Sequence, residues 1–265
     1  MVEIRKQLEI LEELVRQAEK DLNSSGKGTL VIETKGKKTE WYIHQKNQPR
    51  CYLSKKEIGL ARGMAQAAYA REFLKAAERV RKELRRLEQW GAERSAGVMY
   101  RALARPYGRL PVWRKGLVRA YVLPDEEFAK AWESMPFEGK GFAEDAPELY
   151  TEKGERVRSK SEKMIADKLL RMGVRYRYEF PTRLKGYGIV HSDFTLLDLR
   201  ERIEVKMEHF GRMDDPGYVE DNLWKFSAYP QNEFLLGDTF LCTFESLGHP
   251  VDLKAFERMI RTRFF

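Results

Sequence analysis

The sequence predicts an α/β protein in which a helical amino-terminal region with a small antiparallel sheet precedes a domain of helices and strands. Two long proline-free helical patterns before residue 91 predict the first region. Past residue 150 the patterns follow a regular order of helix, three strands, helix, strand and helix. Because 265 residues exceed a typical single domain, we expect two, at residues 1–150 and 151–265.

The amino-terminal helices have distinct signals. Apolar residues recur at alternating spacings of four and three over residues 4–22, the seam of an amphipathic, coiled-coil-like helix. Ser54 and Glu57 form a capping-box pattern at the start of a helix that runs to about Trp90. The second helix can pack against the first in antiparallel fashion, or the seam can join two chains into a homodimer, and both arrangements stay open.

The segment between these helices reads as β-structure. Two β-like runs surround the turn signal "KGKK" at residues 35–38, and the short apolar run "CYL" follows. A small antiparallel sheet is therefore expected between the two helices.

Positive charge is concentrated in the first half of the chain. The net charge is +8, with 29 basic and 22 acidic residues before residue 151 but 20 and 19 after it. Residues 94–124 hold seven basic residues and no acid, interleaved with aromatic residues. Such a segment attracts a polyanion, and its planar groups can stack on bases, although a solvated basic face over packed tyrosines is an open alternative. The expected nucleic-acid contacts are Arg101, Arg105, Arg109, Trp113, Arg114 and Lys115.

Cysteine usage and the amino-terminal stretch exclude several classes of protein. Cys51 and Cys242 are far apart and lack metal-ligand spacing, which argues against a disulfide framework and a zinc site. The first 15 residues alternate charge with apolar residues, unlike a signal peptide or a membrane span. We expect a cytoplasmic protein without a membrane partner.

The second half gives clearer boundaries. Residues 136–155 are rich in glycine, proline and charge, which favours a linker there. Each later segment has a start or stop signal, such as Gly173 after a helix, Pro181 after a strand and Pro216 in a first helical turn. The expected elements are helices at 159–172, 214–229 and 250–265 and strands at 174–181, 193–199, 203–210 and 239–246.

Two neighbouring strands in this order carry acidic residues. In an antiparallel pair, the numbers of facing residues sum to a constant. A two-residue turn and a four-residue loop at 199–202 give the same register, with Asp193 facing Glu208 and Glu204 facing Leu197. Because side chains alternate along a strand, we expect these acids on one face and Val205 and Met207 on the core face. Lys206 is expected on the face of the acids, and Ile203 on the core face.

Facing carboxylates require compensation, because like charges at that distance raise one another's pKa. Mg²⁺ compensates such a pair by taking carboxylate oxygens while keeping several waters, and it suits phosphate chemistry. A nearby lysine can orient the attacking water or stabilise developing charge. Asp193 and Glu208 therefore form a candidate metal site, the alternative being edge-strand charges that block aggregation.

The order of elements, with "SDF" at the head of one strand and "EHFG" at the end of the next, resembles the PD-(D/E)XK nuclease superfamily. The motifs "RSKSE", "YRYEFP", "DFTLLDLRER" and "EHFGRMDDP" are similar to uncharacterised bacterial proteins with this nuclease domain behind a helical region. The resemblance covers roughly residues 155–265. It implies a restriction-endonuclease-like αβββαβα core and a Mg²⁺- or Mn²⁺-dependent endonuclease that hydrolyses phosphodiester bonds, with DNA as the expected substrate.

Carried onto this chain, the resemblance assigns the first acid of the motif to Asp193 and the second to Glu208. Glu162 matches the helical glutamate that many members direct at the same metal, so these three acids form the expected metal set. Ser192 stands where the motif has proline.

The motif lysine is displaced, since Phe210 occupies its place. Lys206 is the first replacement and completes the expected catalytic set with the three acids, and Lys225 is the second. The letters "EVK" at 204–206 spell the motif literally, which leaves Glu204 with Lys206 as an alternative to Glu208.

The missing lysine also motivates a different class of function. The core can be catalytically degenerate, and the protein a nucleic-acid-binding or architectural module. Residues 28–74, a small sheet followed by a helix, loosely resemble the arm-binding domains of phage integrases, which present a three-stranded sheet to DNA.

Overall fold

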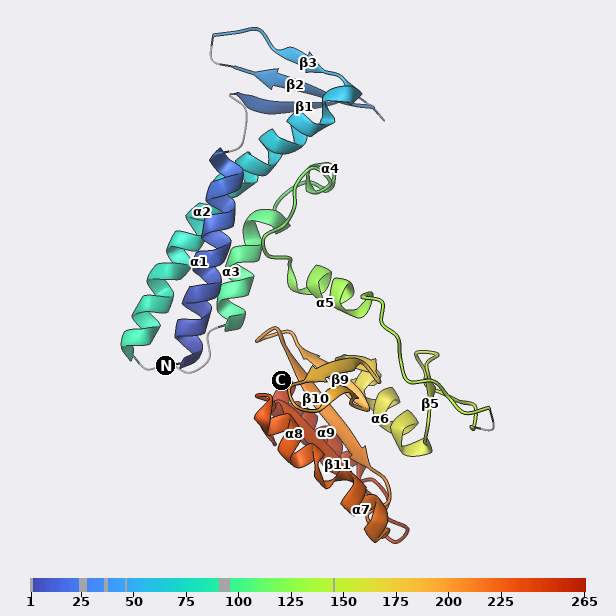
Figure 1. Ribbon diagram of the computed structural model, residues 1–265. Coiled ribbons are helices and arrows are strands. Elements are labelled where there is room, and N and C mark those ends of the chain that lie inside the picture. The colour runs from blue at the N-terminus through green and yellow to red at the C-terminus, as the bar shows by residue number, and fades with distance from the viewer. Residues whose placement is uncertain (1, 24–27, 36–37, 46, 91–95, 145) are drawn as a thin grey trace. The chain divides into compact units, whose positions relative to one another are not determined.

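The computed structural model describes residues 2–23, 28–35, 38–45, 47–90, 96–144 and 146–265. Contacts divide the chain into two units, Met1–Phe128 and Ala129–Phe265 (Figure 1). Both contain helices and antiparallel strands, so the general α/β prediction is confirmed. Arg94 and the centre of the expected turn, residues 36–37, lie outside the described residues. Within the described ranges, no helix is long and apolar enough to cross a membrane.

The first unit is built on a helical hairpin. Helix α1 (Val2–Asn23) lies antiparallel to α2 (Ile58–Trp90), and α3 (Ala96–Gly108) packs beside them (Figure 1). The seam residues Ile4 and Leu11 are fully buried in the cluster that includes Phe73 of α2. The predicted seam is therefore covered by helices of the same chain.

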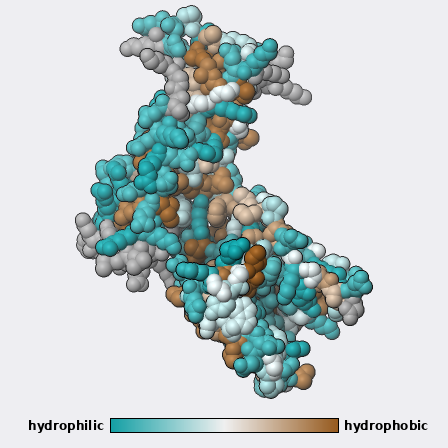
Figure 2. All heavy atoms as spheres, in the orientation of Figure 1, coloured by the Kyte–Doolittle hydropathy of each residue, from teal (hydrophilic) through white to brown (hydrophobic). Residues whose placement is uncertain are grey.

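A three-stranded antiparallel sheet caps the start of α2. It consists of β1 (Thr29–Lys35), β2 (Lys38–His44) and β3 (Cys51–Leu53), in that order. Leu30 and Leu53 on its inner face pack against Ala61 and Met64 of α2, which follows the 3-10 turn η1 (Lys55–Glu57). Figure 2 shows hydrophobic side chains at this sheet above a largely hydrophilic helical surface. The small sheet is thus anchored through one face.

The unit boundary lies earlier than the expected residue 150. The short helix α4 (Val112–Lys115) belongs to the first unit, whereas α5 (Asp125–Glu133) spans the division. Trp132 at the end of α5 donates its Nε1–H to Glu204 at 2.9 Å. Phe142 in the expected linker packs on the core of the second unit. The glycine-rich segment therefore runs along the second unit and does not separate the two.

The second unit contains a four-stranded sheet in the order β11-β10-β9-β6 (Figure 1). Strand β9 is antiparallel to both of its neighbours, whereas β10 and β11 are parallel. The elements are β4 (Leu149–Tyr150), β5 (Arg156–Val157), α6 (Lys160–Arg171), β6 (Arg175–Tyr178), β7 (Pro181–Leu184), β8 (Gly188–His191), β9 (Phe194–Asp198), β10 (Ile203–Phe210), α7 (Pro216–Leu223), α8 (Lys225–Gln231), β11 (Phe240–Phe244) and α9 (Leu253–Phe264).

Helices cover both faces of this sheet. On one face, Val205 and Met207 of β10 are fully buried in a cluster with residues of α6 and α9. On the other, Phe240 of β11 packs with Tyr229 of α8 and with Leu184 of the β7–β8 hairpin. The hairpin was not expected, and the helix predicted at 214–229 is two helices, α7 and α8, that meet at Trp224.

The predicted register of the β9–β10 hairpin is confirmed. Glu204 lies opposite Leu197, and a four-residue loop at 199–202 joins the strands. Arg202 closes this loop at a φ of 55°, the left-handed conformation that such loops commonly need. The longer of the two expected loops therefore forms, and the register is the one that both lengths predict.

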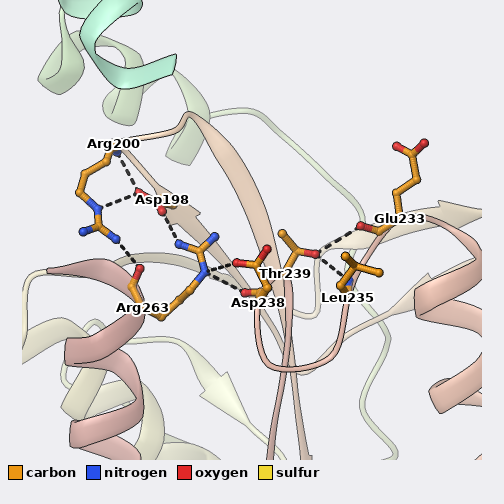
Figure 3. A network of polar contacts seen from close by, with 7 residues as sticks. All are labelled: Asp198, Arg200, Glu233, Leu235, Asp238, Thr239 and Arg263. Carbon is orange, nitrogen blue, oxygen red and sulfur yellow. Dashed lines mark hydrogen bonds and ion pairs between the residues drawn. The ribbon is translucent and has the colours of Figure 1, made fainter. Parts of the chain in front are cut away.

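Figure 3 shows the polar network that ties this hairpin to helix α9. Asp198 is 1% exposed, and its carboxylate accepts hydrogen bonds from Nη1 of Arg263 at 2.5 Å and from the backbone N–H of Arg200 at 2.9 Å. Arg263 also donates its Nε–H to the backbone oxygen of Asp238 at 2.8 Å. The buried carboxylate is thus compensated by a cation from the last helix.

Candidate functional site

Asp193 and Glu208 lie together where β9 begins and β10 nears its end. The register that pairs Phe194 with Met207 brings Asp193 opposite Glu208 one step further on. The backbone N–H of His209 donates to Oδ2 of Asp193 at 2.7 Å and holds this carboxylate beside β10. Glu208 is 1% exposed, and Asp193 is half-buried. The structure therefore brings together the first two acids of the expected metal set.

Burial and mutual repulsion disfavour ionisation of both acids. Burial raises the pKa of Asp193 well above its usual range, and the charges of Glu208 and Glu162 raise it further, against the His209 N–H that lowers it. Burial also raises the pKa of Glu208, although the adjacent Lys225 opposes this effect. The two carboxylates are incompletely compensated by the protein's own groups.

Lys225 of α8 is the cation that is hydrogen-bonded to this pair of acids. Its Nζ lies 2.8 Å from Oε2 of Glu208, and Tyr229 of the same helix donates its hydroxyl to Oε1 at 2.5 Å. Burial lowers the pKa of Lys225, but the charge and hydrogen bond of Glu208 outweigh burial and raise it. Lys225 therefore stays protonated at neutral pH beside the acids.

Glu162 lies in the first turn of α6, the helix that packs on the core face of the sheet. The N-cap Ser159 accepts the Glu162 backbone N–H at 3.1 Å and fixes the first turn. Oε2 of Glu162 accepts the Tyr178 hydroxyl at 2.6 Å and the Arg158 backbone N–H at 2.9 Å. Its carboxylate is thus already engaged, although its charge still acts on Asp193.

Lys206 occupies a different environment from the one expected of a catalytic lysine. It is fully buried, and its Nζ lies 2.8 Å from Oε2 of Glu204 and 3.2 Å from Oγ1 of Thr195. Burial lowers the pKa of Lys206, while Glu204 opposes that effect. Lys206 lies two residues from both Glu204 and Glu208 on the same face of β10, and its ammonium group pairs with Glu204, whereas Lys225 is the partner of Glu208.

A second cation lies in the same row as Lys206. Arg177 faces Thr195, is 3% exposed, and has its guanidinium 4.0 Å from the ring centre of Trp132 and 4.3 Å from that of Phe180. Burial lowers its pKa, and the charge of Glu204 opposes this. Arg177 was not expected at the site. A row of cations thus lies beside the row of acids on one face of the sheet.

His209 points to the other face of the sheet, as the alternation of β10 requires. Its Nδ1 lies 2.9 Å from Oγ1 of Thr243, and its Nε2 lies 3.3 Å from Oε1 of Glu245. Ser161 of α6 donates its hydroxyl to Glu245 at 2.7 Å. His209 therefore contributes its backbone N–H, and not its ring, to the Asp193 site.

The basic residues expected to bind nucleic acid lie in the first unit. Arg101 and Arg105 are exposed on α3, about 6 Å apart along its axis, and the exposed Arg109 directly follows the end of the helix. Trp113 is 41% exposed. Lys115 is instead engaged with Glu127 at 2.6 Å.

The aromatic residues of this segment differ in exposure. Tyr107 is buried, and Tyr121 stacks on Tyr69 with ring centres 5.0 Å apart. The guanidinium of Arg114 lies 5.7 Å from the ring centre of Trp113. Tyr107 and Tyr121 are therefore packed against other residues of the first unit, whereas Trp113 is exposed and available for stacking.

Comparison of the chain with protein-family models, with curated proteins and with solved structures found no match. Within the residues that the structure describes, no three His, Cys, Asp or Glu side chains are grouped closely enough to form a metal cage.

Proposed function

We propose that the protein is a metal-dependent endonuclease that hydrolyses phosphodiester bonds, with DNA as its substrate. The observation that carries the proposal is the pair of acids, Asp193 and Glu208, which neighbouring strands bring to one place and whose pKa values are both raised. Groups with strongly perturbed pKa values and a specific charged partner are typical of functional sites. Lys225 is that partner here.

The arrangement of the second unit supports a restriction-endonuclease-like core. Helix α6 precedes the antiparallel strands β6, β9 and β10, and α7 and α8 lead into β11 and α9. This order agrees with the αβββαβα pattern that the sequence motifs imply, with the β7–β8 hairpin as an insertion. Asp193 and Glu208 then stand at the positions of the two motif acids.

The residues present fit a hard divalent cation. Asp193 and Glu208 would hold it through carboxylate oxygens, and Glu162 stands close enough for its charge to act on Asp193. When bound, Mg²⁺ or Mn²⁺ polarises a phosphoryl oxygen and lowers the pKa of a coordinated water.

Lys225 takes the role that the motif gives to its lysine. Its ammonium group lies beside Glu208, and its side chain is 18% exposed and so remains partly accessible to solvent. A protonated lysine at that place orients the attacking water and stabilises the negative charge that develops on the phosphate. Lys206 has no such access, because its side chain is fully buried.

The exposed arginines of α3 and of the turn that follows it are proposed to hold the nucleic-acid backbone. Arg101, Arg105 and Arg109 present a line of positive charge, and Trp113 is exposed nearby in the sequence. Guanidinium groups bind phosphates through paired N–H groups and give salt-dependent affinity. This surface also supports the second candidate function, a binding module without hydrolysis.

A cleavage assay tests the proposal. Purified protein is mixed with end-labelled DNA and Mg²⁺ or Mn²⁺, and the products are separated by length. We expect shortened products with the native chain and none with Asp193→Ala, because that change removes one of two metal-holding carboxylates. DNA that is bound in a salt-sensitive way but stays intact with both proteins would favour the binding module. DNA that is neither bound nor cut would exclude both functions.

A further inference from the structure

Two aromatic rings are stacked at the surface of the second unit. The ring centres of Tyr187, at the tip of the β7–β8 hairpin, and Trp224, between α7 and α8, lie 5.6 Å apart at 20°. Tyr187 is 36% exposed and Trp224 is 38% exposed. Neither ring belongs to a hydrophobic cluster of the described core. These rings, the Tyr187–Trp224 stack, therefore present apolar surface to solvent.

The hairpin that carries Tyr187 is held firmly against α8. Asn232 accepts the Lys185 backbone N–H through Oδ1 at 2.6 Å. The Tyr187 hydroxyl donates to Oε1 of Gln231 at 3.2 Å. Leu184 of the hairpin is buried in the cluster that includes Tyr229. The stack is therefore a preformed surface whose ordering does not have to be supplied by a ligand.

Both residues of the stack are close to the acids along the chain. Trp224 directly precedes Lys225, whose Nζ is bound to Glu208. Tyr187 is six residues before Asp193, so at most about 20 Å of β-strand separates them. The hairpin also carries the exposed cations Arg183 and Lys185. A nucleic-acid strand held at the acids therefore has the two rings and these cations within reach of its flanking nucleotides.

We propose that the Tyr187–Trp224 stack binds an unpaired nucleobase next to the hydrolytic site, so that the substrate is single-stranded or locally opened nucleic acid. The inference rests on the proposed hydrolytic function, since it names the class of substrate that this site takes. Aromatic side chains bind any base through its π-face, and in a duplex both faces of each base are already covered by neighbours. The rings therefore select for lack of pairing and not for sequence.

Binding in the absence of hydrolysis tests the inference. The full chain is titrated in EDTA against a fluorescein-labelled oligothymidylate and against a blunt duplex of the same length. Trp224→Ala is expected to weaken binding of the oligothymidylate about tenfold and to leave duplex affinity unchanged. Trp224→Phe retains an aromatic face and should keep most of the affinity. Leu223→Ala is the matched control, because Leu223 is a 51% exposed neighbour outside the stack.

The outcomes separate the stack from the hydrolytic proposal. If Trp224→Ala binds the oligothymidylate as tightly as the native chain, or weakens the duplex equally, the stack does not bind unpaired bases. Tyr187→Ala provides the same comparison if Trp224→Ala does not fold. A native chain that needs Trp224 for single-strand binding but never cuts DNA with Mg²⁺ would retain the stack and reject hydrolysis. If the native chain cuts DNA while the stack variants bind the oligothymidylate as tightly as the native chain, hydrolysis is retained and the role of the stack is rejected.

Discussion

Replacing Lys225 with methionine is expected to slow Mg²⁺-dependent DNA cleavage by about 10²–10³-fold, the usual cost of removing one preorganised donor at a site of developing charge. Lys225 is the cation bonded to Glu208, at 2.8 Å. Its loss also removes the charge that opposes the raised pKa of Glu208, so less of that carboxylate is ionised at neutral pH. Single-turnover cleavage rates measured from pH 6 to 9 would show both the loss and a shift of the pH profile to higher pH.

Lys206→Met is the matched comparison, because it makes the same chemical change at a second lysine beside the acids. Lys206 is bonded to Glu204 at 2.8 Å. We expect Lys206→Met to lower stability, since it unpairs Glu204, but to change the cleavage rate of the folded protein less than tenfold. A large rate loss in Lys206→Met with little change in Lys225→Met would instead assign catalysis to the Glu204 and Lys206 pair.

Arg263→Ala is expected to destabilise the second unit by about 3 kcal/mol. The side chain of Arg263 is only 10% exposed and meets Asp198, which is 1% exposed, at 2.5 Å. Removing one partner of a buried ion pair leaves an uncompensated charge, which typically costs 3–5 kcal/mol. The backbone N–H of Arg200 still bonds to Asp198 and the Arg200 guanidinium Nε lies 3.5 Å from the same carboxylate, which places the expected cost at the lower end. Urea unfolding followed by circular dichroism measures the change.

Asp238→Asn serves as the control for that measurement. Asp238 also contacts Arg263, at 3.0 Å, but its side chain is 51% exposed. Exposed ion pairs contribute at most about 1 kcal/mol, so this variant should unfold almost as the native chain does. Equal destabilisation by both variants would show that the buried charge at Asp198 is not what Arg263 stabilises.

Local patterns in the sequence were sufficient to predict the central hairpin. The register follows from the positions of the residues on either side of the loop at 199–202, and it did not depend on which of two loop lengths forms. Alternation then placed Val205 in the core and Glu208 on the opposite face. The order of α6, β6, β9, β10, β11 and α9 could be read in the same way, whereas the short strands between them could not.

Contacts between distant elements could not be predicted from such patterns. Whether Lys206 or Lys225 meets Glu208 depends on how α8 packs on the sheet, and no spacing in the sequence records that packing. The β7–β8 hairpin was missed because glycines surround its tip and Arg183 and Lys185 interrupt its apolar pattern. Pairing of Asp198 with Arg263 joins residues 65 positions apart.

Thermal unfolding at pH 8 with and without Mn²⁺ tests most directly whether Asp193 and Glu208 form one cation site. The folded pKa of Asp193 is raised, so its favourable contribution to stability is complete below the unfolded pKa of about 3.9 and is lost as the pH rises toward the folded value. At pH 8 the native chain therefore carries a cost that Asp193→Asn removes, while the amide oxygen can still accept the His209 N–H.

We expect the metal-free Asp193→Asn chain to melt at a higher temperature than the native chain at pH 8, and with a smaller advantage at pH 5. Mn²⁺ at about a hundred times its dissociation constant should stabilise the native chain by about 2.7 kcal/mol and leave Asp193→Asn unchanged. Glu220→Gln, a change at an exposed residue of α7, should respond to Mn²⁺ as the native chain does. Equal Mn²⁺ shifts in the native chain and Asp193→Asn, or none in either, would contradict a shared cation site.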